Sequence, residues 1–106
     1  MMKREFLKSF YIAGFNYYEG AYVFKDLAIG TQLKLKIDKK NRYDDCAVML
    51  KYKNYKLGFI PKNENREIFK MLEMGYDVFE CVVQQISPEE HPAEQVRVGV
   101  FIISKK

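Results

Sequence analysis

The chain has 106 residues, of which 48% are hydrophobic and 30% charged, and 18 basic against 14 acidic residues leave a formal net charge of +4. A chain of this length holds one domain and buries enough surface for one hydrophobic core. These values exclude a large multidomain enzyme, a collagen, a mucin-like stalk and an ATPase core. We therefore expect a single domain over residues 1–106.

The sequence predicts neither a membrane anchor nor an export signal. The apolar stretch 6–15 follows a basic start, but Lys8 and Ser9 interrupt it and no small-residue cleavage site follows. No uncharged apolar run reaches the roughly 18 residues that span a bilayer. Cys46 and Cys81 are too few for a disulfide framework and too far apart for a short-spaced zinc pair. We expect two buried thiols in a cytoplasmic protein.

Apolar and polar residues alternate in a pattern that predicts six short strands. The clearest case is the segment 32–38, in which Lys34 and Lys36 point to one face and apolar residues to the other. Lys53 and Asn54 predict a hairpin turn between the third and fourth strands. The strands are expected over residues 6–13, 32–38, 47–52, 55–60, 78–86 and 96–103, and 16–20 is expected to be a loop.

One helix is expected between the fourth and fifth strands. Asn63 can cap its start, Ile68 and Leu72 belong to one apolar stripe, and Gly75 fits just beyond its end. Six short strands with one helix indicate a mainly β protein, of all-β or α+β class, folded as a small curled sheet or barrel.

Charge divides the chain into two regions of opposite sign. Residues 33–62 hold nine bases and three acids, whereas residues 63–95 hold eight acids and two bases. Two interpretations remain open: a basic face that binds an anion or an acidic neighbour, or a solvated surface with a local excess of charge.

The sequence offers little for catalysis. The single histidine, His91, lies in an acidic loop without a nucleophile beside it. Asp38, Asp44 and Asp45 have the oxygen ligands that magnesium prefers, but the surrounding bases favour ordinary loop acids. No Gly-rich phosphate loop is present. We expect no catalytic residue, no metal and no cofactor.

The loop 39–45 has the residues that a single-stranded nucleic acid requires. Tyr43 can stack on a base, and the neighbouring bases, Arg42 among them, can contact phosphates. Asp44 can accept a hydrogen bond from a sugar hydroxyl, and Tyr17 and Tyr18 offer a second aromatic platform. In the alternative interpretation Tyr17 or Tyr43 packs on the edge of the core and Asp44 caps a turn.

Three segments in register resemble the HIRAN domain: residues 13–20 (AGFNYYEG), residues 41–44 (NRYD) with Ala47 and Val48 just after, and residues 57–61 (LGFIP), followed by Gly75. HIRAN domains form the N-terminal module of helicase-like transcription factor and related remodelers, and also occur as short bacterial proteins.

The resemblance implies an OB-like or SH3-like six-stranded barrel that captures the 3′ end of single-stranded DNA. On that basis Tyr17 and Tyr43 would hold the terminal base, Asp44 would bond the terminal 3′-hydroxyl and Lys62 would contact a phosphate. Asn41 would shape the loop or add a polar contact. The partners implied are single-stranded DNA or its 3′ end and a separately encoded helicase or nuclease, in DNA repair or processing.

The chain departs from the remodelers at three positions. Asn16 replaces an arginine, Arg42 a proline and Phe59 a histidine, so we expect a weaker and less end-specific binder. The alternative function is a protein-interaction module, a monomer or weak homo-oligomer, in which the basic region of one copy meets the acidic region of another.

Overall fold

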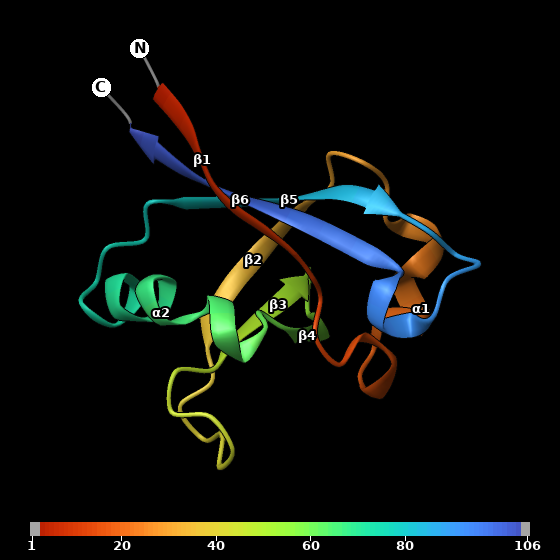
Figure 1. Cartoon of the computed structure of the whole chain (residues 1–106), viewed down its shortest axis with the longest axis horizontal. Coiled ribbons are helices and arrows are strands. Elements are labelled where there is room, and N and C mark those ends of the chain that lie inside the picture. The colour runs from red at the N-terminus through yellow and green to blue at the C-terminus, as the bar shows by residue number, and fades with distance from the viewer. Residues whose placement is uncertain (1–2, 105–106) are drawn as a thin grey trace.

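The computed structural model describes residues 3–104, whose six strands form one antiparallel sheet (Figure 1). The strands lie in the order β1-β6-β5-β2-β3-β4. Their bounds are β1 Lys3–Tyr11, β2 Gln32–Ile37, β3 Val48–Tyr52, β4 Tyr55–Phe59, β5 Phe79–Ile86 and β6 Val96–Ser104. The helices are α1 Gly20–Val23 and α2 Arg66–Glu73, with 3-10 helices at Phe15–Tyr17, Phe24–Asp26, Lys62–Glu64 and Pro92–Glu94.

The two edges of the sheet meet and close it into a barrel. Just beyond β1, Ala13 pairs with Phe59 at the end of β4 through two backbone hydrogen bonds of 2.9 Å. This single bridge joins the β1 edge of the sheet to the β4 edge. The preceding Gly58 permits the approach, because a Cβ there would overlap the Ala13 carbonyl oxygen and lie 2.6 Å from Ile12 Cγ2. The prediction of a mainly β, six-stranded small barrel is confirmed.

Apolar side chains from alternate positions of the strands fill the barrel. Leu33 is buried between the exposed Gln32 and Lys34, as the alternation predicts. Cys81 also lies in this core, where burial raises the pKa of its thiol to about 12. Cys46 is only half-buried, so the prediction of two buried thiols is correct for one of them.

Helix α2 lies beside the barrel and starts later than predicted. Asn65, not Asn63, occupies its N-cap, because the chain first makes a 3-10 turn over residues 62–64. Its buried residue is Ile68, against the core. At the other end Gly75, with a φ of 89°, donates to Leu72 O at 3.0 Å, and Tyr76 donates to Met71 O at 2.8 Å. This is the predicted glycine C-cap, in a Schellman motif.

The segment after β1 is more helical than predicted. Where the sequence predicts a loop over residues 16–20, the chain forms a 3-10 helix and then enters the short helix α1. Neither is long enough to repeat an apolar stripe, so periodicity does not reveal them. Gly20 is needed at the start of α1, because a Cβ there would lie 2.5 Å from Cε1 of the buried Phe15 ring.

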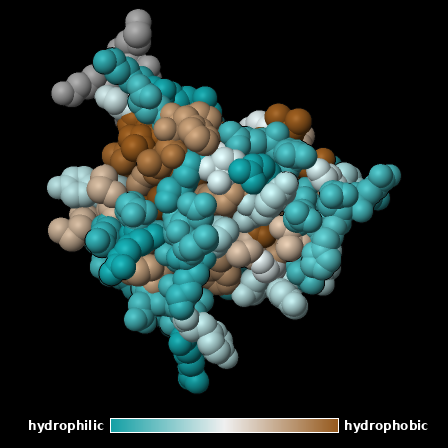
Figure 2. Space-filling model, in the orientation of Figure 1, coloured by the Kyte–Doolittle hydropathy of each residue, from teal (hydrophilic) through white to brown (hydrophobic). Residues whose placement is uncertain are grey.

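The loop between β2 and β3, residues 38–47, projects from the barrel at the bottom of Figure 1. Figure 2 shows that this end of the molecule is mainly hydrophilic, whereas hydrophobic side chains gather on the opposite side, near the termini. Within residues 3–104 no helix has the length and apolar character needed to cross a membrane.

Candidate nucleic-acid interface

A shallow pocket of about 270 Å³ lies where the projecting loop meets the Ala13–Phe59 bridge that closes the barrel. Six of the nine site residues expected from the sequence line it, and they come from three stretches of the chain: Tyr18, residues 41–44 and residues 59–62. The lining residues are Ala13, Tyr18, Asn41, Tyr43, Asp44, Ala47, Phe59, Ile60 and Lys62.

The wall opposite the loop is aromatic and carries a cation. The rings of Tyr18 and Phe59 meet edge to face, with centroids 5.5 Å apart and planes at 71°. Lys56 Nζ lies 4.3 Å from the Tyr18 centroid and 4.5 Å from that of Phe59. The ring quadrupoles attract this ammonium and keep it beside the pocket.

Side-chain hydrogen bonds hold the projecting loop in shape. Asn41 Oδ1 accepts from the backbone N–H of Tyr43 at 2.9 Å and from that of Asp44 at 3.0 Å. Asp38 accepts in turn from the side chain of Asn41 at 3.4 Å. The Tyr43 side chain makes no use of the core, since the residue is 90% exposed. The loop therefore presents a free ring on a braced backbone.

The carboxylate of Asp44 is fixed at both oxygens. Oδ1 accepts from the backbone N–H of Cys46 at 2.9 Å, and Oδ2 accepts from Asn65 Nδ2 at 2.8 Å. Asn65 is only 2% exposed. Asp44 thus braces a turn, as in the alternative interpretation, yet each carboxylate oxygen keeps a second lone pair for another donor.

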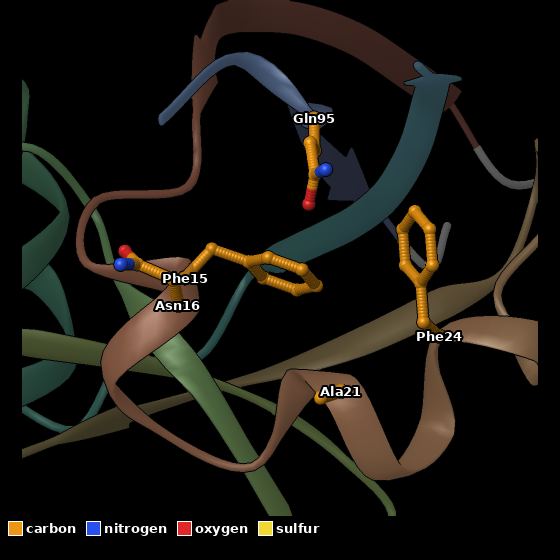
Figure 3. Close-up of a pocket in the computed structure, with 5 residues that line it drawn as sticks. All are labelled: Phe15, Asn16, Ala21, Phe24 and Gln95. Carbon is orange, nitrogen blue, oxygen red and sulfur yellow. The ribbon is translucent and has the colours of Figure 1, made fainter. Parts of the chain in front are cut away.

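Three expected residues do not line this pocket: Asn16, Tyr17 and Arg42. Asn16 lines a second pocket, of about 260 Å³, together with Phe15 and Phe24. Figure 3 shows both phenyl rings pointing into that pocket and the amide of Asn16 turned away from them. Arg42 is exposed to solvent. Tyr17 is 79% exposed and Tyr43 90%, so neither tyrosine packs on the edge of the core.

Lys62 at the pocket is weakly engaged, whereas Glu64 and Glu67 of the acidic region are paired with Lys8. Lys62 Nζ donates to Tyr43 O at 3.4 Å, which leaves most of its donor capacity free. Lys8 lies 3.6 Å from Glu64 and 3.4 Å from Glu67. The pKa of the Glu67 carboxyl is lowered, mainly by a backbone hydrogen bond and secondly by the hydrogen bond and charge of Lys8. Two members of the acidic region are thus paired within the chain.

Two residues at the site were not expected from the sequence. Asn65 contacts Asp44, which lies 21 positions earlier in the chain. Its one local signal is that asparagine favours a helix N-cap, and this signal indicated Asn63 equally. Strand alternation alone predicts only that Lys56 lies on the surface. Its contact with Tyr18 depends on how the segment after β1 packs on β4.

The single histidine of the sequence, His91, does not line the pocket. His91 is exposed, and its Nδ1 accepts from the backbone N–H of Ala93 at 3.1 Å. In the part of the chain that the structure describes, no three His, Cys, Asp or Glu side chains come close enough to hold a metal ion.

Comparison with known proteins agrees with the fold. The family model of the HIRAN domain matches residues 7–105. The structure is similar to that of a protein from Lactobacillus plantarum, at a TM-score of 0.81 and 17% identity, over 98% of this chain and 99% of that one. It is also similar to the HIRAN domain of human HLTF, at a TM-score of 0.69 and 16% identity, over 97% and 81% of the two chains. None of the curated proteins matches the sequence significantly.

The chain therefore belongs to the HIRAN domain family, as the sequence resemblance predicted. HIRAN domains are nucleic-acid-binding modules, not catalytic domains.

Proposed function

We propose that this chain is a non-catalytic module, a single domain over residues 1–106, that binds single-stranded DNA at its 3′-hydroxyl end. The observation that carries the proposal is the pocket itself, which gathers a free aromatic ring, a fixed carboxylate and a lysine in about 270 Å³. A terminal nucleotide offers a base to stack, a hydroxyl to donate and a phosphate to neutralise.

Three lining residues and two exposed residues outside the pocket have roles in this proposal. Tyr43 stacks on the terminal base, and Tyr17, which is 79% exposed and does not line the pocket, adds a second ring. Asp44 accepts a hydrogen bond from the 3′-hydroxyl, because a hydroxyl has a proton to donate to a carboxylate whereas a charged phosphate has none. Lys62 takes the adjacent phosphate, and Arg42 adds charge from the loop.

The replacement of arginine by Asn16 removes one cation from this scheme. Asn16 lines the other pocket and not the pocket of Asp44, so it does not replace the missing contact. Lys56, held over Tyr18 and Phe59, supplies an ammonium on that side. We infer that the affinity depends strongly on salt. We propose a helicase or nuclease in DNA repair or processing as the protein partner.

The protein-interaction alternative receives less support. It needs an acidic surface free to meet the basic region of another copy. Three of the eight acids of residues 63–95 are already paired within the chain: Glu64 and Glu67 face Lys8, and Glu80 lies 2.5 Å from Arg4. We therefore propose a monomer as the binding form.

Tyr43→Ala is expected to weaken binding of a short single-stranded oligonucleotide by about 1–3 kcal/mol, the contribution of one base stack. Because Tyr43 is 90% exposed, its loss should leave the thermal midpoint of unfolding almost unchanged. Fluorescence anisotropy with a labelled oligonucleotide measures the first effect, and circular dichroism the second.

Tyr76→Ala is the matched control, since Tyr76 is also an exposed tyrosine but follows α2 outside the pocket. It should bind like the parent protein. If Tyr43→Ala and the parent bind the oligonucleotide equally well, Tyr43 does not stack on a base and the proposed site is wrong.

A further inference from the structure

Three lysines stand in one row across three neighbouring strands. Lys34 of β2 lies opposite Lys51 of β3, and Lys51 lies opposite Lys56 of β4. Residues opposite each other in an antiparallel pair project from the same face. The buried neighbours Leu33, Leu50 and Leu57 place that face outside the barrel. We call Lys34, Lys51 and Lys56 the lysine row.

Such a row costs stability unless something anionic occupies it. Like charges directly opposite each other in a sheet repel, and here two such pairs share the middle lysine. Within residues 3–104, none of the three ammonium groups forms an ion pair. A feature that lowers the stability of the free protein is typical of a binding surface.

The row borders a groove. Lys34, Lys51 and Lys53 line a pocket of about 320 Å³, together with Gln32 and Tyr52. Glu80, an acid close to this groove, accepts from Arg4 at 2.5 Å and from Gln32 at 3.4 Å. At the other end of the row, Glu19 accepts from the backbone N–H of Lys56 at 2.9 Å. Both acids thus already accept hydrogen bonds within the chain, whereas no lysine of the row forms an ion pair within residues 3–104.

The row ends at the candidate pocket. Its last member, Lys56, is the ammonium that lies over Tyr18 and Phe59. The neighbouring cross-strand row runs from Lys36 through Met49 to Phe59, which lines the pocket. Adjacent strands are about 4.8 Å apart, so the lysine row extends about 10 Å from the pocket over the outer face of β3 and β2.

We propose that the lysine row is a second subsite, which binds the phosphodiester backbone of the strand upstream of the nucleotide in the pocket. This inference rests on the proposed function, because the pocket fixes where the strand begins. The row binds phosphates by charge and reads no base. It makes affinity increase with strand length, in the range that small barrels of this kind cover.

The test compares a trinucleotide with a twelve-nucleotide strand, both with free 3′-hydroxyl ends, on the parent protein and on the double variant Lys34→Gln/Lys51→Gln. Counterion release predicts that the variant binds the longer strand about tenfold or more weakly at low salt and that the salt dependence falls by about 0.7 per lysine. Its affinity for the trinucleotide should stay unchanged, and its thermal midpoint should not fall, because a repulsion is removed. Lys70→Gln on the exposed face of α2 is the control with one charge lost elsewhere.

Each outcome decides between the two proposals. If the variant binds both strands as the parent does, with the same salt dependence, the lysine row is not a subsite although the pocket is. If Lys70→Gln weakens the longer strand per charge as much as the double variant, only net charge matters and the row is again overturned. If the parent binds neither strand at low salt, the proposed function fails, and the lysine row with it.

Discussion

Gly58→Ala is expected to destabilise the protein by about 3–4 kcal/mol, a large share of the stability of a domain this size. The added Cβ would overlap the Ala13 carbonyl oxygen and lie 2.6 Å from Ile12 Cγ2. Its φ of 149° adds backbone strain for any residue but glycine. To relieve this overlap Ala13 must move, and this movement breaks its pair with Phe59, so the barrel opens at that point. Urea unfolding followed by circular dichroism measures the loss.

Gly30→Ala separates the two causes. Gly30 has a φ of 95°, but a Cβ there meets nothing within 4 Å. The substitution should therefore show backbone strain alone, about 1 kcal/mol. Equal losses for Gly58→Ala and Gly30→Ala would mean that the close approach of the two strands does not limit closure. Ala13 and Phe59 also line the pocket, so Gly58→Ala should weaken oligonucleotide binding as well.

Asn65→Asp is expected to cost up to about 4 kcal/mol at pH 7. It replaces the donor 2.8 Å from Asp44 Oδ2 with a second carboxylate at a site that is 2% exposed. The cost is bounded, because the introduced carboxyl can take up a proton and donate again, at about 1.4 kcal/mol per pH unit above its ordinary range.

The sign of the pH dependence follows from that proton. Folding raises the pKa of the introduced carboxyl above its value in the unfolded chain, so stability relative to the parent is kept at low pH and lost as the pH rises. The difference in free energy of unfolding should therefore shrink from pH 7 towards about pH 4. Asn63→Asp, an exposed position two residues away, adds the same charge and should cost little at any pH. A difference for Asn65→Asp that does not change with pH would show that the contact with Asp44 is not what the substitution breaks.

Much of the fold could be predicted because strands and turns leave patterns among neighbouring residues in the sequence. The alternation around Lys34 and Lys36, the hairpin turn at Lys53 and Asn54, and Gly75 after the helix each depend on neighbours in sequence. The mainly β barrel and the family follow from these and from the three HIRAN-like segments. Elements too short to repeat an apolar stripe, such as α1, left no such signal.

Less of the candidate site could be predicted, since its contacts join segments far apart in the chain. Tyr43 and Asp44 share one loop and could be singled out by residue type. The partner of Asp44, Asn65, comes from the start of α2, and Lys56 reaches Tyr18 only through the packing of α1 and β4. The sequence also could not place Asn16, which lines a different pocket from Asp44. Residue type indicates the chemistry, whereas the long-range packing decides which groups share a pocket.

The most direct test of the proposed function is the affinity of the parent protein for one single-stranded oligonucleotide with either a free 3′-hydroxyl or a 3′-phosphate, measured by fluorescence anisotropy at low salt. The fixed carboxylate of Asp44 accepts from a hydroxyl and repels a phosphate, so the hydroxyl end should bind about tenfold or more tightly. Equal affinity for the two ends would contradict capture of the 3′ end.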